Sequence, residues 1–324
     1  MTDEAAALVP AGTAALSTVL LETAERAGGY ARQAKAANTL RAYRADWADF
    51  AGWCEAHGLP ALPATESTVA LYLTDLAERV KTSTLQRRLS AIAQAHKAAG
   101  HVPPTKGRVS MVWQGIRRSK GTAQKGKAPA RTQEVRAMVA TCGDGLLGVR
   151  DRALLLLGFA GAFRRSELVG LDCSDLDFGH DGLTVTLRRS KTDQEGAGQK
   201  VGIPYGSTPA TCPVRNLRAW LDAAQVTAGP VFRGVNRWGQ VSAARLTDRA
   251  VALVVKRCAE AAGLDPAQYA GHSLRAGLAT AAAEAGVSER VIMAQTRHKS
   301  LPMVRRYIRD GNLFRENAAA AVGL

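Results

Sequence analysis

Residues 272–307 read HSLRAGLATAAAEAGVSERVIMAQTRHKSLPMVRRY, and this stretch decides how the second half of the chain folds. It opens with His272 and Arg275, and a spacing of three residues places two side chains on one face of a helix. Leu274 and Leu278 turn from that face toward a core. The exposed face can therefore hold an anion between an imidazole and a guanidinium group.

The end of the same stretch carries a second histidine, His298, and Tyr307 nine positions later. Nine residues make two and a half helical turns, so on one unbroken helix these two side chains would point in opposite directions. Pro302 suits the first turn of a new helix, which predicts a bend at about 299–302. The bend can bring both side chains into one pocket. A pocket of one Arg, two His and one Tyr indicates phosphate chemistry.

Three motifs, in this order along the chain, resemble the signature of the tyrosine recombinases, the phage integrase family. HSLR begins at His272, RH ends at His298, and Tyr307 follows nine residues later. Upstream, GAFRRSELVGL at 161–171 resembles the first catalytic Arg motif of that family, in which Ser-Glu-Leu follows the Arg after one residue. The resemblance covers roughly residues 35–322 and is closest to the simple two-domain (Cre-like) type.

The resemblance implies six catalytic side chains. A phosphodiester gains negative charge when a fifth ligand arrives, so planar bidentate donors suit it. A tyrosine with a pKa near 10 is only about 0.1% phenolate at neutral pH and needs help to lose its proton. The resemblance implies that Arg164 and Arg275 bind the phosphate and that Tyr307 is the nucleophile. His272 is expected to help deprotonate the tyrosine or to bind phosphate. His298 is expected to bond the scissile phosphate, and Lys191 to act as general acid.

The implied reaction gives a 3′-phosphotyrosyl enzyme and a free 5′-hydroxyl. Because the phosphotyrosine bond conserves the energy of the broken diester, rejoining needs no ATP, and we expect neither a cofactor nor a metal. The segment 121–127 fits part of a P-loop, but Ala128 stands where Ser or Thr is needed. Asp172, Asp175 and Asp177 form the one dense acidic group, which we interpret as a structural turn, with a metal site as the alternative.

The chain departs from the family pattern at two places. The family usually has Gly before the second His, where this chain has Arg297, and Val304-Arg305 replaces common Thr residues. Two neighbours of Arg164 also enter the interpretation. Glu167 is expected to lock the local geometry, and Arg165 is interpreted as a surface residue or a DNA contact.

Positive charge is concentrated in one block of the chain. The formal net charge is +15, yet residues 81–131 hold twelve of the 43 Lys and Arg residues and no Asp or Glu, which leaves 31 basic against 28 acidic residues elsewhere. Solvated surfaces usually mix both signs, so this block indicates contact with nucleic acid, with a membrane surface as the weaker alternative. The resemblance implies that the nucleic acid is double-stranded DNA. The candidate DNA-binding residues are Lys81, Arg87, Arg88, Lys97, Arg117, Arg118, Lys120, Lys125, Lys127 and Arg131.

Other compartments are disfavoured by the composition. The chain has no run of 18 apolar residues, and its Ala-rich start has acids where a signal peptide needs basic residues. The five cysteines are scattered without a C-x-x-C pair, which fits reduced thiols. We therefore expect a cytoplasmic protein with no membrane partner.

The predicted fold is mainly α and has two domains. A flexible lead-in at 1–30 precedes an N-terminal four-helix core-binding (SAM-like) domain at 31–118, because apolar residues recur three and four apart in four stretches. A basic linker without periodicity, 119–130, leads to a catalytic domain at 131–311. Residues 312–324 are expected to form a C-terminal helix. The resemblance implies that this helix docks on a neighbouring protomer, and packing on its own domain is the alternative.

The catalytic domain is expected to be mainly α with a small antiparallel sheet, the DNA breaking-rejoining fold. A strongly apolar helix at 149–163 is expected to deliver Arg164. Alternation of apolar and polar residues between Leu176 and Pro204 predicts the sheet, with Lys191 where the first strand enters a loop. Further helices are predicted at 132–141, 213–225, 245–262, 271–286, 288–297 and 302–309.

The leading functional hypothesis is a site-specific DNA recombinase that binds inverted-repeat half-sites and assembles as a tetramer on DNA. A type IB topoisomerase or a hairpin-forming resolvase could use a similar set of residues, with less need for a tail that links protomers. A DNA-binding regulator that has lost catalysis is the alternative from another class, although all six catalytic side chains are present.

Overall fold

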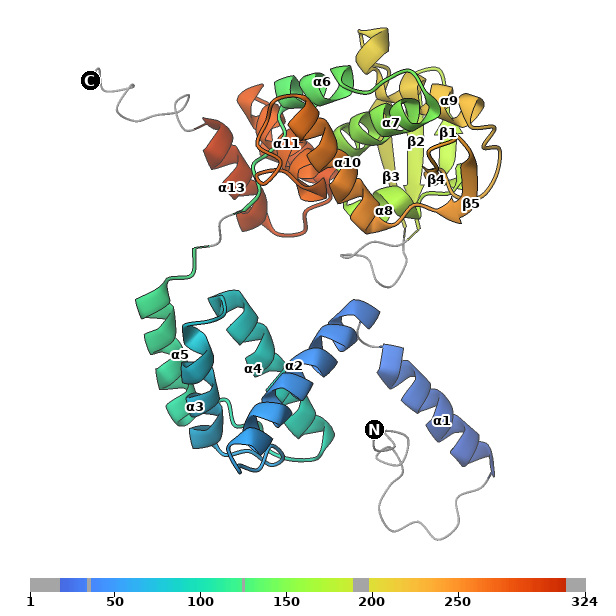
Figure 1. The fold of residues 1–324 in the computed structure, drawn as a ribbon. Coiled ribbons are helices and arrows are strands. Elements are labelled where there is room, and N and C mark those ends of the chain that lie inside the picture. Colours follow the sequence, from blue (N-terminus) through green and yellow to red (C-terminus); the bar gives the residue numbers. More distant parts are fainter. Residues whose placement is uncertain (1–17, 34–35, 124–125, 189–197, 313–324) are drawn as a thin grey trace, which may run out of the picture. The chain divides into compact units, whose positions relative to one another are not determined.

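The structure is a computed structural model that describes residues 18–33, 36–123, 126–188 and 198–312. The chain divides into two compact units, Met1–Lys125 and Gly126–Leu324. Figure 1 shows the helices of the first unit in blue to green and the helices and strands of the second in green to red.

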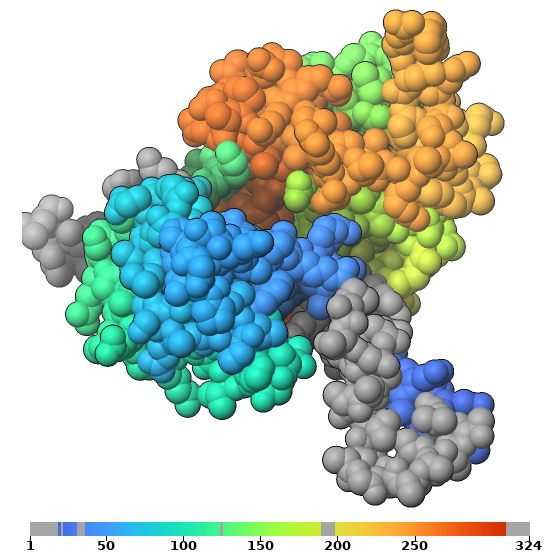
Figure 2. All heavy atoms as spheres, turned by 60° about the horizontal axis from the view of Figure 1, so that its bottom comes forward, coloured from blue at the N-terminus to red at the C-terminus, as the bar shows by residue number. Residues whose placement is uncertain are grey.

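The first unit is helical. Four of its helices lie at the four predicted stretches, and a further helix, α1, occupies the second half of the predicted lead-in. The bounds are α1 (Thr18–Gln33), α2 (Ala37–Ala56), α3 (Glu66–Ala77), α4 (Thr82–Ala98) and α5 (Gly107–Lys120). Helices α2, α3 and α4 share one core that contains the fully buried side chains of Phe50, Tyr72, Leu73, Leu85 and Ile92. In the space-filling view these helices form one continuous body (Figure 2).

The second unit combines helices with two small sheets. Its helices are α6 (Thr132–Ala140), α7 (Leu146–Ala160), α8 (Arg165–Gly170), α9 (Pro213–Ala223), α10 (Asp248–Ala261), α11 (Gly271–Glu284), α12 (Glu289–Thr296) and α13 (Leu301–Asn312). Its strands are β1 (Leu176–Phe178), β2 (Gly182–Leu187), β3 (Gln199–Pro204), β4 (Arg233–Val235) and β5 (Val241–Arg245). None of the described helices is long and apolar enough to cross a membrane.

The predicted antiparallel sheet is confirmed in the order β1-β2-β3. Leu183, Val185 and Leu187 are buried, whereas the residues between them are only partly covered, as the alternating pattern requires. Leu183 lies opposite Ile203, and Val185 opposite Val201. The sheet therefore presents one apolar face to the core.

The hairpin of β4 and β5 was missed, since the sequence analysis predicted a helix from residue 245. Strand β5 reads VSAAR and exposes four of its five residues, so the sequence carries no alternating apolar signal there. Arg245 belongs to β5, where its guanidinium donates to the Asp172 carboxylate over 2.5 Å. The helix begins only at Asp248, with Thr247 as its cap.

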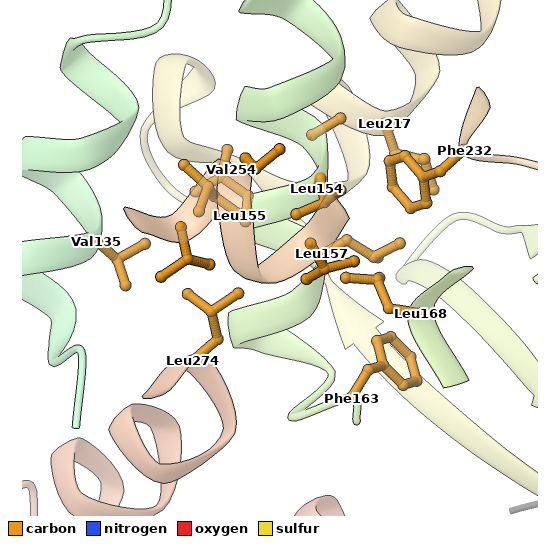
Figure 3. Packing of buried hydrophobic residues seen from close by; sticks show 14 of the residues in the cluster. Val135, Leu154, Leu155, Leu157, Phe163, Leu168, Leu217, Phe232, Val254 and Leu274 are labelled. Carbon is orange, nitrogen blue, oxygen red and sulfur yellow. The ribbon is translucent and has the colours of Figure 1, made fainter. Parts of the chain in front are cut away.

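Helix α7 lies at the centre of the core of the second unit. Figure 3 shows Leu154, Leu155 and Leu157 of this helix between Leu274 of α11 and Phe232, the residue before β4. All five side chains are almost fully buried. A close-packed interior is hardly compressible, so the helices that form this core are a rigid support for a polar site at its edge.

The end of the predicted linker belongs to the second unit. The backbone N–H of Ala128 donates to the carbonyl of Gln268 over 2.8 Å, and that of Ala130 donates to the carbonyl of Ser273 over 2.9 Å. Gly277 permits this contact, because a Cβ added there would lie only 1.8 Å from the Ala130 carbonyl oxygen. The sequence analysis therefore extended the linker too far.

Candidate active site

Arg164 stands at the start of a short helix and not at the end of the long apolar one. Helix α7 ends at Ala160, and the chain then turns through Ala162, whose φ is +45°. Arg164 is the N-cap of α8. The prediction that the apolar helix delivers this arginine is wrong, because apolar residues continue through the turn and hide the helix end from a periodicity argument.

Glu167 holds Arg164 in place, as expected from the sequence. Its Oε2 accepts from the backbone N–H of Arg164 over 2.9 Å, and its Oε1 accepts from Nη1 of the same residue over 2.5 Å. The carboxylate is buried. Burial alone would raise the pKa of Glu167, but the hydrogen bonds from Arg164 and the charge of Arg297 lower it, so the carboxylate stays ionised.

Arg275 lies one turn into α11 and is 1% exposed. Its Nη1 donates to the carbonyl of Ala162 over 2.7 Å, whereas its buried Nη2 finds no hydrogen-bond partner among the described residues. Burial and the neighbouring charges of Arg164 and Arg297 lower the pKa of Arg275. A buried cation with an unused donor is stabilised when an anion arrives, which fits a phosphate site.

The predicted bend before Tyr307 is confirmed. Helix α12 ends at Thr296, Arg297 follows in the left-handed conformation with φ of 56°, and α13 begins at Leu301. The rings of His298 and Tyr307 lie 5.8 Å apart between centroids. Helix α13 continues to Asn312, beyond the predicted end at residue 309.

Tyr307 of α13 contacts His272 at the start of α11. The Tyr307 hydroxyl lies 3.0 Å from Nε2 of His272. Burial, followed by the charges of Arg275, Arg164 and Arg165, lowers the pKa of His272, so its imidazole is neutral at neutral pH. A neutral imidazole with Nε2 unprotonated accepts the phenolic proton. The first and last residues of the stretch quoted above therefore lie within hydrogen-bond distance, an arrangement that suits proton transfer from Tyr307 to His272.

The orientation of His298 is set by a threonine. The Thr296 hydroxyl donates to the carbonyl of Ile292 over 2.6 Å and lies 2.7 Å from Nδ1 of His298. A hydroxyl has only one proton, and that of Thr296 is used on Ile292, so Nδ1–H of His298 must donate to the Thr296 oxygen. The other ring nitrogen, Nε2, is then unprotonated in the neutral imidazole. Burial and nearby Arg275 lower the pKa of His298 to about 4.

Four of these side chains, those of Arg164, His272, Arg275 and His298, line a pocket of about 550 Å³. Its lining includes Arg164, Arg165, Ser166, Asp248, His272, Arg275, His298, Lys299, Ser300 and Met303. The exposed Arg165 lies 3.7 Å from Asp248. Lys299 was missed by the sequence analysis, and its position after His298 was the one signal available.

Two of the sequence-based candidates cannot be placed, and the acidic group has a structural role. Lys191 and Lys125 lie outside the described residues. Asp172 and Asp175 both accept from Arg188, at 2.6 and 2.7 Å. Within the described ranges, no group of three or more His, Cys, Asp or Glu side chains could hold a metal ion.

Several of the candidate DNA-binding residues are engaged with acids from other parts of the chain. Arg88 is the most engaged: its side chain is 13% exposed and donates to Asp49 over 2.5 Å and to Tyr72 over 3.0 Å. The other ion pairs are Arg87–Asp46, Lys120–Glu78 and Arg131–Glu284. Lys127 donates to the carbonyl of Ala267 over 2.5 Å. The block without acids in sequence is thus partly neutralised in space.

Four of the candidates are exposed and form no ion pair in the part of the chain that the structure describes. They are Lys81, Lys97, Arg117 and Arg118. Arg117 and Arg118 lie in the last turn of α5, where cations also interact favourably with the helix dipole. These four side chains are the most available for a phosphate backbone.

Comparison with known protein families gives two matches. The phage integrase family matches residues 130–312, and the N-terminal SAM-like domain of phage integrases matches residues 30–101. An integrase/recombinase xerD homolog of Selenomonas ruminantium is 47% identical over 292 residues, which cover 88% of this chain and 85% of that protein. A tyrosine recombinase XerC of Xanthomonas campestris pv. campestris is 30% identical over 232 residues, covering 70% of this chain and 65% of the relative.

Solved structures share the fold at low sequence identity. A XerH site-specific recombinase bound to palindromic difH substrate has a TM-score of 0.60 and 17% identity, over 80% of this chain and 73% of that one. A lambda integrase dimer bound to a COC′ core site has a TM-score of 0.57 and 18% identity, over 89% and 75% of the two chains. Matches to both family domains and the extensive identity to the Selenomonas protein show that this chain belongs to the phage integrase family, as a tyrosine-type recombinase.

Proposed function

We propose that this protein cleaves and rejoins DNA at specific sites through a covalent 3′-phosphotyrosyl intermediate. The observation that carries the proposal is the 3.0 Å contact between Tyr307 and a neutral His272, beside the unused buried donor of Arg275. The proposed nucleophile thereby contacts a base that lines the same pocket as the anion-binding group.

The first step is an in-line attack. The Tyr307 oxygen transfers its proton to Nε2 of His272 and bonds to phosphorus, while the bond from phosphorus to the 5′ oxygen breaks. That leaving oxygen takes a proton from a general acid, a role we assign to Lys191 on the family resemblance. Rejoining runs the same steps in reverse with the 5′-hydroxyl of another strand.

Cationic side chains carry the charge that develops on the phosphate. Nη2 of Arg275 and the guanidinium of Arg164 would donate to the two non-bridging oxygens. His298 would donate to the same group through Nε2 once the negative charge of the bound phosphate raises the pKa of the imidazole and this nitrogen takes up a proton. Because the pocket is positively charged before DNA binds, stabilisation needs no rearrangement of charge during the reaction.

The proposal is tested by trapping the intermediate. A pool of short duplexes of random sequence, each nicked near its centre, allows the 5′-hydroxyl fragment to diffuse away after cleavage. We expect a protein–DNA adduct that survives denaturation and forms equally well in EDTA, since side chains supply the positive charge. Sequencing the trapped DNA would also give the target site.

Two results would overturn this assignment. Absence of any adduct, together with specific DNA binding, would identify a regulator without catalysis. Relaxation of supercoiled plasmids of arbitrary sequence, without exchange between sites, would identify a topoisomerase.

We further propose that two inverted half-sites are bound by pairs of protomers and that four protomers form the complete assembly. The XerH and lambda integrase structures hold DNA, which supports duplex DNA as the partner. Lys81, Lys97, Arg117 and Arg118 are the proposed phosphate contacts, because they are exposed and form no ion pair among the described residues. Residues 313–324 lie outside the described part and are proposed to link neighbouring protomers. Their sequence would place Leu313, Phe314, Ala318, Ala321 and Val322 on one face if the segment were helical.

Binding and assembly should separate in one experiment. If about six phosphates are neutralised, the logarithm of the half-site association constant should fall with a slope of roughly −5 against the logarithm of salt concentration. Deletion of 313–324 should leave that slope and the half-site affinity unchanged, and it should abolish complexes of four protomers with two full sites. Electrophoretic mobility and sedimentation on the recovered site measure both quantities.

The variant Arg117→Gln/Arg118→Gln should reduce the magnitude of the slope by about two, and Arg88→Gln by less, because Arg88 is engaged with Asp49. A deletion that weakens half-site binding and lowers the Tm of the free protein would show that the tail packs on its own domain.

A further inference from the structure

Arg297 occupies a position that is unusual for a long charged residue. It follows the last turn of α12 in the left-handed conformation, with φ of 56° and ψ of 40°. Glycine adopts this conformation without steric cost and is the common residue at such helix ends. Nevertheless, the Arg297 side chain is 3% exposed.

The guanidinium of Arg297 joins two segments that are far apart in sequence. Nη1 donates to the carbonyls of Gly161 and Gln295, both over 2.8 Å. Nη2 donates to the carbonyl of Ala162 over 3.0 Å and to Oε2 of Glu167 over 3.1 Å. The end of α12 is thereby fastened to the turn that precedes Arg164.

Aromatic packing supports the same contact. The guanidinium carbon of Arg297 lies 5.1 Å from the centre of the Phe163 ring, within the range of a cation–π interaction. Phe163 is itself part of the core of the second unit. The Phe163 ring therefore packs on the plane of the guanidinium, while the hydrogen bonds hold its N–H groups. The group has little freedom to turn toward the pocket.

Glu167 connects Arg297 with Arg164. The same carboxylate accepts from the backbone and side chain of Arg164 and from Arg297, so two cations share one anion. When a second cation satisfies part of a carboxylate, the first cation is held less firmly. Arg164, whose side chain remains 18% exposed, is then able to turn toward a phosphate.

We propose that Arg297 is a positioning residue that binds the Glu167 carboxylate and the 161–162 carbonyls. These bonds keep Arg164 available to the scissile phosphate, and they hold His298 at a fixed distance from the same phosphate. Arg297 does not itself touch the substrate. The effect on His298 follows from the sequence, because Thr296 and His298 flank Arg297 and the Thr296 hydroxyl lies within hydrogen-bond distance of the His298 ring. This inference rests on the proposed cleavage reaction.

The variant Arg297→Gly separates the backbone role from the side-chain role. Glycine suits the left-handed position better than arginine, so a residue that merely ends α12 would be replaced without loss of cleavage. We expect instead that the single-turnover cleavage rate constant at saturating nicked DNA falls by about 30-fold or more, because small misplacements of catalytic groups have effects of up to about 100-fold. Half-site affinity should stay within about twofold of the wild-type value, since no DNA contact is removed.

A second substitution, at Glu167, distinguishes positioning from a purely structural role, because only positioning predicts that it restores part of the cleavage rate. Gln at this position still caps α8 but carries no charge, so it no longer competes for Arg164 when Arg297 is absent. We expect Arg297→Gly/Glu167→Gln to cleave about tenfold faster than Arg297→Gly alone. Glu167→Gln alone should be impaired, because it leaves the buried Arg297 without its anion.

Gln225→Gly is the matched control. Gln225 is also a non-glycine residue with positive φ, 53°, and it follows the end of α9. This variant should leave the cleavage rate constant unchanged. Arg297→Lys should fall between wild type and Arg297→Gly, because an ammonium group can pair with Glu167 but cannot span both carbonyls.

The outcomes separate this inference from the proposed function. No adduct with the wild-type protein would remove the proposed function itself. A wild-type adduct with an equally active Arg297→Gly would refute the positioning role alone. Loss of activity in Arg297→Gly that Glu167→Gln does not relieve would likewise refute it, and a matching drop in Tm would assign Arg297 to stability.

Discussion

The variant Tyr307→Phe is expected to form no covalent adduct with DNA at any time of incubation. It removes a single oxygen, the atom that bonds to phosphorus, and it leaves the ring that lies 5.8 Å from His298. Half-site affinity should remain within about twofold of wild type, because the hydroxyl acts in the chemical step and the aromatic ring stays in place. Denaturing gel electrophoresis of the trapped complex measures the adduct, and mobility shifts measure the affinity.

His272→Ala provides the companion measurement. In the proposed mechanism His272 accepts the proton of Tyr307, so its removal should slow adduct formation by about 10²–10³-fold without abolishing it. The remaining activity should rise with pH, since hydroxide and solvent then take the phenolic proton. An adduct formed by Tyr307→Phe would show that another residue is the nucleophile, and an unchanged rate in His272→Ala would remove the base from the mechanism.

The variant Arg275→Ala is expected to lose about 10³-fold or more in the single-turnover cleavage rate constant. Its unused buried Nη2 is the donor best placed for a non-bridging phosphate oxygen. The loss should be much smaller on a substrate whose scissile phosphate is replaced by an uncharged methylphosphonate, because that substrate has no charge for the arginine to neutralise. An equal loss on both substrates would contradict a role in charge neutralisation.

Stability should respond in a different way from activity. Burial lowers the pKa of Arg275, which means that the folded protein disfavours its charge. Removing this guanidinium should therefore leave the Tm within about 3 °C of wild type, and the Ala162 carbonyl keeps its bond from Arg297. Arg165→Ala is the control, as Arg165 is exposed and paired with Asp248, and its cleavage rate should fall less than about tenfold.

The sequence predicted the proposed catalytic set because the family motifs carry these residues in order, and the chemistry of phosphate transfer restricts residue types as well as spacing. The bend between His298 and Tyr307 followed from the helical period and from Pro302, both of which are local properties. The alternating strands and the apolar stripes of α2–α5 were predictable for the same reason. Glu167 was recognised because its partner lies only three residues away.

Contacts between distant segments were beyond the reach of the sequence. No local pattern shows that Asp46 and Asp49 pair with Arg87 and Arg88, so the basic block looked more open than it is. The hairpin of β4 and β5 carries no alternating apolar signal, because its side chains are mostly exposed. The start of α8 was hidden by apolar residues that continue through the turn after α7.

Arg297 illustrates what the sequence shows about a residue and what only the tertiary structure shows. The sequence shows that an arginine stands where the family usually has glycine, and by itself this predicts only a disturbed turn. The tertiary structure places its guanidinium against the 161–162 carbonyls and Glu167, more than 100 residues away along the chain. Spacing and residue chemistry thus predicted which groups are proposed to react, whereas packing between distant segments decided which charges are paired and which stay exposed without an ion pair among the described residues.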